Sequence, residues 1–244
     1  PLDRLLCVGT RGMGAREYHP AHELAQTDAH TNLLDIHQLS ELAAMVQRHR
    51  TQKNRALSHA TLSKALGLIR VGSSAGGARS KALIAKAPDG TLRDGTVSHE
   101  NGYSYWLLKF DSAHNADRDG TDPKGMTRVE YLYSALARLC HIQIPNTEYI
   151  LDGNDFHFLI KRFVRISTHT GIGKLHYASW AGLAHAGRDT TGAYSYEQLA
   201  MLIRQLHLGQ DTILELYRRA IFNIVGRNQD DHTKNFGFLM EKTG

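Results

Sequence analysis

Residues 222–238 read F-N-I-V-G-R-N-Q-D-D-H-T-K-N-F-G-F, and this stretch is the most informative feature of the chain. An apolar run breaks into a polar loop and then returns to apolar residues. Two aspartates, a histidine, a lysine and an asparagine fall within the six positions from Asp230 to Asn235. Such a density of charged and hydrogen-bonding groups predicts either a reactive site or an Asx-rich turn that ends a helix and begins a strand.

The spacing of Asp230 and Asn235 favours phosphoryl transfer. That reaction needs a carboxylate to orient and deprotonate the attacking hydroxyl, and an amide oxygen a few residues later to hold a metal ion. Protein kinases use an Asp followed five residues later by Asn, and Asp230 and Asn235 have this spacing. We therefore predict Asp230 as the catalytic residue and Asn235 as a metal ligand.

A glycine- and serine-rich stretch at residues 71–85 reads V-G-S-S-A-G-G-A-R-S-K-A-L-I-A. Glycines let backbone N–H groups approach phosphate oxygens closely, and serine hydroxyls add donors. A flexible connection is the alternative, and the Walker A pattern is absent. The predicted nucleotide-covering residues are Gly72, Ser73, Ser74, Ala75, Gly76 and Gly77. Lys81 is either a further nucleotide contact or a solvated lysine at a strand edge.

A strand lysine and a helix glutamate follow. Residues 105–111, Y-W-L-L-K-F-D, predict a strand that carries Lys109, although an alternating strand could turn this lysine to solvent. Residues 127–139 predict a helix whose apolar stripe consists of Val129, Leu132, Leu136 and Leu139. We place Glu130 in its first turn, where the helix dipole favours a carboxylate. Kinases also use such a Lys and Glu to orient the α- and β-phosphates of ATP.

The remaining elements predict an α+β chain. Helices are expected, in chain order, at residues 33–48, 59–68, 195–206 with Ser195 as N-cap, and 211–225 with Asp211 as cap and Gly226 as stop. A strand is expected at residues 80–87 and a hairpin at 147–163, which turns at D-G-N. Residues 1–20 predict the end of a small β-containing subdomain. Polar loops are expected at residues 86–102 and 112–125. Residues 171–191, which are rich in glycines and small residues, predict a partly mobile loop with one short helix.

Taken in order, these motifs resemble the HipA family of bacterial serine/threonine kinases, the toxin halves of HipA/HipB toxin–antitoxin pairs. The resemblance rests on G-S-S-A-G-G-A-R-S-K-A, W-L-L-K-F-D, the K-R-F at residues 161–163 and the loop that holds Asp230. It implies a two-lobed, protein-kinase-like fold with a smaller β-rich lobe and a helical lobe. The implied parts are an N-terminal subdomain with a linking helix at 1–60, the smaller lobe at 61–165 and the beginning of the helical lobe at 166–244.

The resemblance implies transfer of the ATP γ-phosphate to a protein hydroxyl, with Mg²⁺ as cofactor. Asp230 matches the family's catalytic aspartate, and His232 and Asn235 match its D-x-H-x-x-N loop. Lys109 matches the lysine that contacts the ATP phosphates, and Glu130 resembles the acidic residue near it. Ser73 and Ser74 lie where the family carries an autophosphorylated serine; a phosphate there would put negative charge where the ATP phosphates must sit.

The chain departs from the family pattern in two places. The family often has F-D-R after the hairpin, whereas this chain reads K-R-F-V-R, with Val164 in place of the acid. The family's second metal-binding aspartate, expected after the catalytic loop, is not found before Gly244. We expect a fragment that is trimmed at both ends and transfers phosphate poorly. The alternatives are a truncated pseudokinase and an antitoxin-binding corepressor scaffold without phosphate transfer.

Composition predicts a cytoplasmic protein without a membrane segment. Charged residues make up 22% of the chain, and no apolar run approaches the ~20 residues that span a bilayer. Two unpatterned cysteines argue against a disulfide framework or a zinc site. The resemblance implies a HipB-like antitoxin, a helix-turn-helix repressor, as partner, and DNA contact through that antitoxin. It also suggests an aminoacyl-tRNA synthetase as one class of protein substrate.

Overall fold

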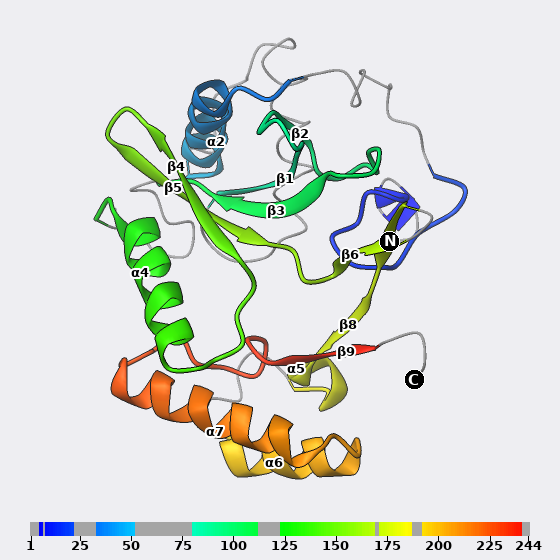
Figure 1. The fold of residues 1–244 in the computed structure, drawn as a ribbon, viewed down its shortest axis with the longest axis vertical. Coiled ribbons are helices and arrows are strands. Elements are labelled where there is room, and N and C mark those ends of the chain that lie inside the picture. The colour runs from blue at the N-terminus through cyan, green and yellow to red at the C-terminus, as the bar shows by residue number, and fades with distance from the viewer. Residues whose placement is uncertain are drawn as a thin grey trace. The chain divides into compact units, whose positions relative to one another are not determined.

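The structure is a computed structural model, which describes residues 5–6, 8–21, 33–51, 80–111, 123–168, 171–186 and 192–240. Within the helix at 36–51, the side chains of residues 42 and 45–51 are not described. The glycine-rich residues 71–79 and the helix predicted at 59–68 lie outside the described residues. The chain divides into two compact units, whose elements are drawn in Figure 1. The first comprises Pro1–Leu132 and Pro145–Lys174, and the second comprises Tyr133–Ile144 and Leu175–Gly244.

A five-stranded antiparallel sheet forms the centre of the first unit, with the strand order β2-β1-β3-β5-β4. The strands are β1 (Lys81–Lys86), β2 (Leu92–Asp94), β3 (Ser104–Lys109), β4 (Thr147–Asp152) and β5 (Asp155–Lys161). The middle residues of β1 and β5 are buried in unbroken runs rather than at alternate positions. Both faces of these strands are therefore covered.

Helix α2 (Ile36–Thr51) packs on this sheet (Figure 1). Leu39 and Ala43, one turn apart, join a buried cluster with the sheet residues Ala82, Ile84, Trp106, Leu108, Phe110 and Leu159. The predicted amphipathic helix is confirmed, but it begins three residues later than expected. Asp35 explains the difference, because its Oδ1 accepts hydrogen bonds from the N–H groups of His37 at 2.8 Å and Gln38 at 3.2 Å, as an N-cap does.

The hairpin predicted at 147–163 is confirmed as β4 and β5, and Gly153 in its turn has a φ of +56°. Strand β2 contradicts the loop predicted at 86–102, because it pairs with β1 over three residues. The residue after it, Gly95, cannot carry a side chain without moving its neighbours. A Cβ there would lie 2.4 Å from the carbonyl carbon of Ile84.

Two further strands, β6 (Arg165–Thr168) and β7 (Gly171–Lys174), form a separate antiparallel pair. Strand β7 therefore contradicts the first part of the loop predicted at 171–191. The β-structure predicted at residues 1–20 is also not found, since the described part of that segment, residues 5–6 and 8–20, contains turns, bends and helical residues but no strand.

Residues 10–17 form an opening loop that three cations from the β5–β7 region hold. Arg162 donates to the carbonyls of Gly95 at 2.9 Å and Met13 at 2.6 Å, while Arg165 donates to Gly12 at 3.1 Å. Lys174 donates to the Thr10 carbonyl at 3.1 Å and also pairs with a carboxylate of the same loop, that of Glu17. Burial lowers the pKa of Arg162, which is 4% exposed. The basic K-R-F-V-R stretch thus supports the fold through Arg162 and Arg165.

Helix α4 (Met126–Leu139) confirms the predicted helix, but its apolar stripe is not the face that is buried. The stripe Val129, Leu132, Leu136 and Leu139 is 41–76% exposed, while the buried positions are Thr127, Ser134 and Ala137. Apolar spacing identified the helix correctly. It did not identify the covered face, because small residues allow the closest approach to a neighbour.

The second unit has α5 (Trp180–Leu183), α6 (Tyr196–Gln205) and α7 (Gln210–Val225), with β8 (His176–Ser179) paired to β9 (Gly237–Met240) (Figure 1). Its buried core consists of Trp180, Leu199, Ile203 and Leu216. Ser195 precedes α6 as predicted, and its N–H donates to Gln198 Oε1 at 2.8 Å. Helix α7 ends at Gly226 as predicted, but Gly209 is its N-cap and Asp211 lies in the first turn.

The chain is thus a mixed α+β protein with an antiparallel sheet and C-terminal helices. No helix in the described part of the chain combines the length and apolar character that crossing a membrane requires.

Candidate functional site

Lys109 is the last residue of β3 and lies opposite Lys81 of β1 and Phe158 of β5 in the sheet register. Its Nζ lies 2.5 Å from Oε2 of Glu130 on α4 and 5.7 Å from the centroid of the Phe158 ring. The side chains of Lys109 and Glu130 are 25% and 34% exposed, respectively. The alternative of a lysine that simply faces solvent is therefore wrong. Lys109 is paired and yet still accessible to a ligand.

Glu130 is the fifth residue of α4 and so lies in the second turn, not in the first as predicted. The favourable effect of the helix dipole on a carboxylate is confined to the first turn. The dipole therefore does not account for a carboxylate at this position. The ion pair with Lys109 does, and it joins the strand to the helix.

The loop between α7 and β9 arranges its polar groups around Asp230. Asn228 Oδ1 accepts from the Asp230 N–H at 3.2 Å, and Asn235 Nδ2 donates to the Asp230 carbonyl at 2.5 Å. The Asn235 N–H donates to the His232 carbonyl at 2.9 Å. These contacts include the Asx turn that the sequence also allowed. Because the Asn235 amide nitrogen is directed to a carbonyl, its Oδ1 is the side-chain atom left to coordinate a cation.

The Asp230 carboxylate itself faces solvent, with its side chain 91% exposed. His232 Nε2 lies 3.6 Å from Asp230 Oδ1. The loop thus fixes the main chain of Asp230 with hydrogen bonds while the carboxylate stays accessible. A substrate hydroxyl could approach it, as a general base requires.

Tyr196 of α6 supports this loop and was not singled out from the sequence. Its hydroxyl donates to the Asp231 carboxylate and accepts from Asn223 Nδ2 of α7 at 3.0 Å. Burial and the hydrogen bond to Asp231 raise the pKa of Tyr196 to about 12. Asn223 was the available signal, because it is a polar residue inside the apolar run F-N-I-V.

The loop is also tied to the start of α5. The Trp180 N–H donates to the Phe236 carbonyl at 2.8 Å, and the Ala181 N–H donates to the Thr233 carbonyl at 3.1 Å. Together with the pairing of β8 and β9, these bonds hold both sides of the segment that carries Asp230 and Asn235.

The donors around this loop suit Mg²⁺ rather than a metal held by protein side chains alone. Among the described residues, no three His, Cys, Asp or Glu side chains converge as a metal site. Mg²⁺ is commonly held by one or two protein oxygens together with substrate phosphates and water. The amide oxygen of the exposed Asn235 fits that pattern.

The predicted site residues that the structure describes therefore lie in two places. Lys109 and Glu130 are in contact within the first unit, where Lys81 is the half-buried first residue of β1. Asp230, His232 and Asn235 share one loop of the second unit. The predicted glycine-rich loop with Ser73 and Ser74 lies outside the described residues, so its roles stay predictions.

Comparison with known proteins identifies the family. The sequence profile described as HipA-like C-terminal domain matches residues 73–244. No curated protein matches the chain. Among solved structures, the Shewanella oneidensis MR-1 toxin–antitoxin complex of HipA, HipB and operator DNA contains a similar chain, with a TM-score of 0.62 at 15% identity. The match covers 100% of this chain and 55% of the other, so this chain spans about half the length of that relative. Because the profile covers well over half of the sequence, the chain belongs to the HipA-like C-terminal domain family.

Proposed function

We propose that the chain is part of a HipA-like serine/threonine kinase, which transfers the γ-phosphoryl group of ATP to a protein hydroxyl. The ion pair between Lys109 and Glu130 at 2.5 Å carries this proposal. A strand lysine held by a helix glutamate is the arrangement with which protein kinases bind the α- and β-phosphates. The family assignment and the Asp230–Asn235 loop support the same reaction.

The residues have separate roles in this proposal. Lys109, held by Glu130, neutralises the α- and β-phosphates, and Asp230 orients the attacking hydroxyl and accepts its proton. Asn235 would hold Mg²⁺, which would neutralise charge on the nucleotide phosphates. The backbone N–H groups of residues 72–77 cover the phosphates, with Lys81 as a further nucleotide contact and Ser73 or Ser74 as the site of autophosphorylation.

We extend the proposal to the architecture and partners. The sheet-containing unit corresponds to the smaller lobe of a kinase, and the helical unit to the larger, helical lobe. The solved relative occurs in a complex with HipB and operator DNA. A HipB-like antitoxin is therefore the proposed partner here, with DNA contacted through it and the cytoplasm as the compartment.

Intact-mass analysis after incubation with Mg-ATP tests the proposal, with Asp230→Asn as the control. A slow and partial gain of one phosphate in the parent protein alone, located at Ser73 or Ser74 by peptide mapping, is the expected result. ATP binding by calorimetry without any phosphate gain would instead favour the pseudokinase. Neither binding nor phosphate gain, together with unchanged antitoxin and operator binding in Asp230→Asn, would favour the corepressor scaffold.

A further inference from the structure

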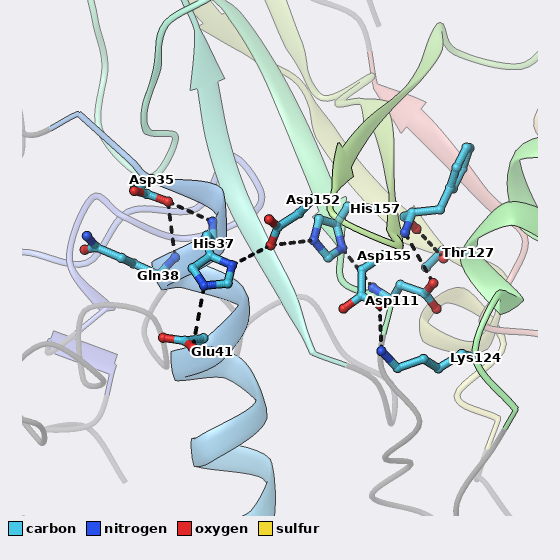
Figure 2. Close-up of polar contacts among 11 residues, drawn as sticks. Asp35, His37, Gln38, Glu41, Asp111, Lys124, Thr127, Asp152, Asp155 and His157 are labelled. Atoms are coloured by element: carbon cyan, nitrogen blue, oxygen red, sulfur yellow. Dashed lines mark hydrogen bonds and ion pairs between the residues drawn. The ribbon is translucent and has the colours of Figure 1, made fainter.

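A buried polar network in the first unit centres on Asp111, two residues after Lys109 in the chain (Figure 2). Asp111 is 7% exposed, and its carboxylate accepts two backbone hydrogen bonds. Gly125 N–H donates to Oδ1 at 2.8 Å, and Phe156 N–H donates to Oδ2 at 3.3 Å. Asp111 thereby joins the end of β3 to β5 and to the residue that precedes α4.

The contact with Gly125 fixes where α4 begins. Gly125 has a φ of +90°, and its carbonyl accepts from the Val129 N–H at 3.1 Å, which closes the first helical turn. Thr127 is 1% exposed, and its hydroxyl donates to the Phe156 carbonyl at 2.5 Å. The N–H and the carbonyl of Phe156 are thus both used to hold the segment that opens the helix. Glu130 follows Thr127 by three residues, which is about one turn.

His157 supports Asp111 from the other side. The ring is 0% exposed, and its Nδ1 accepts from the Asp111 N–H at 3.1 Å. An accepting Nδ1 places the proton of the neutral ring on Nε2, which lies 3.9 Å from Asp152 Oδ2. Burial lowers the pKa of His157 and so favours this neutral form. The Phe110 ring packs in a T-shaped arrangement with the imidazole, at a centroid distance of 5.5 Å.

We infer that Asp111 is a positioning residue, which fixes the start of α4 and thereby holds Glu130 against Lys109. Lys109 and Asp111 belong to one short segment, and Gly125 and Glu130 to another, so the Asp111–Gly125 bond and the Lys109–Glu130 pair connect the same two segments at two points. The effect of Asp111 on nucleotide binding rests on the proposed function. Its effect on the position of α4 does not.

Asp111→Asn tests this role with little change in shape. An asparagine presents only one oxygen, so its amide nitrogen would face one of the two N–H donors. We expect Mg-ATP affinity to fall roughly tenfold, which corresponds to ~1.4 kcal/mol. The same substitution in a Glu130→Gln background should change the affinity less than twofold, because the residue through which Asp111 acts has already been altered. Such a double-mutant cycle isolates the coupling between the two positions.

Asp94→Asn is the matched control. Asp94 Oδ1 accepts from the Thr96 N–H at 2.8 Å and the Thr96 hydroxyl at 2.6 Å, and so serves the end of β2. We expect it to leave Mg-ATP affinity within twofold of the parent. If Asp111→Asn lowered Mg-ATP affinity equally with and without the Glu130 substitution, the inference would be overturned, because Asp111 would then act on the fold in general.

Amide hydrogen exchange without nucleotide separates this inference from the proposed kinase activity. In Asp111→Asn, faster exchange should be concentrated at residues 125–130, while Asp94→Asn leaves those amides unchanged. Unchanged exchange there in Asp111→Asn would refute the positioning role. If the parent protein bound no Mg-ATP but this exchange pattern were found, the proposed function would fail while the docking role of Asp111 stood.

Discussion

Lys109 Nζ lies 2.5 Å from Glu130 Oε2, and a second pair in the same sheet repeats this geometry. Lys86 Nζ also lies 2.5 Å from a glutamate, Glu148, and each lysine lies 5.7 Å from the centroid of an aromatic ring. The two pairs resemble each other locally, but only the Lys109 pair involves α4. The chain therefore contains its own control for the proposed nucleotide contact.

Lys109→Met should reduce Mg-ATP affinity at least ~10-fold, because the cation that faces the phosphates is removed. Methionine has a similar length and lies at the same register position opposite Phe158, so the fold should be retained. Calorimetric titration measures the affinity, and circular dichroism checks the fold. Lys86→Met should bind Mg-ATP like the parent; an equal loss in both variants would exclude a specific role for Lys109.

Asp230→Asn should lower phosphate transfer ~10²-fold or more while changing Mg-ATP affinity little, since the lost group acts on the hydroxyl proton. The main-chain bonds of residue 230 to Asn228 and Asn235 do not involve its carboxylate and should persist. Single-turnover phosphorylation and calorimetry on one preparation separate the two effects. Transfer near the parent rate would remove Asp230 from the reaction.

Tyr196→Phe should loosen the Asp230 loop without altering the sheet of the first unit. The variant loses the hydrogen bonds of the hydroxyl to Asp231 and Asn223, each of which contributes about 0.5–1.5 kcal/mol, because the freed Asp231 carboxylate is exposed to water. Amide exchange at residues 228–236 should accelerate, while exchange in β1 and β3 stays at the parent rate. Tyr194→Phe is the control, because its ring packs against Trp180 in the same unit.

The stabilisation from Tyr196 should disappear in strong alkali. Its pKa is about 12 in the folded chain, against ~10 for a free phenol. A folded-state pKa above the unfolded value gives stability that is complete below pH ~10 and is lost as the pH rises toward 12. The Tm difference between the parent and Tyr196→Phe should therefore shrink across this range. A constant difference would show that the hydroxyl is not protected in the folded state.

His37 should titrate above its usual range. The Asp152 carboxylate, which lies 3.0 Å from His37 Nδ1, raises the pKa of this imidazole, and Glu41 adds to the effect (Figure 2). The contact between α2 and the β4–β5 hairpin is thus strongest below pH ~6.5 and is lost as the pH rises through the raised pKa. NMR titration of the imidazole signals, assigned with His37→Gln, measures the value, and Asp152→Asn should lower it.

The sequence predicted the parts of the fold that depend on local patterns. The end of α7 at Gly226, the polar loop and β9 follow one another in an unbroken stretch, where the change from apolar to polar residues marks each boundary. Strands β6 and β7 were missed because each has only four residues, mostly polar in β6 and with two glycines in β7, and they are stabilised by pairing with each other.

The site, like the fold, was predictable where it depends on local sequence patterns and not where it depends on contacts between distant residues. Lys109 and Glu130 could be selected because kinases use these residue types in this order on a strand and a helix. Asp111 could not, because its partner His157 is 46 residues away in the sequence. Tyr196 was signalled only indirectly, through the polar Asn223, because its partner Asp231 is 35 residues away. Nothing local distinguishes a buried aspartate that receives two N–H groups from a solvated one.

The opening loop at residues 10–17 is held mainly through its carbonyls, which Arg162, Arg165 and Lys174 bind from outside the segment. Every residue type has a carbonyl, so this anchoring does not specify which side chains the loop carries. The loop can therefore accumulate substitutions over evolution while its path stays constant. Substitution of any of the three cations should disturb the path of the loop far more. Similarity in this part of the chain should be sought in the residues that hold the loop rather than in the loop itself.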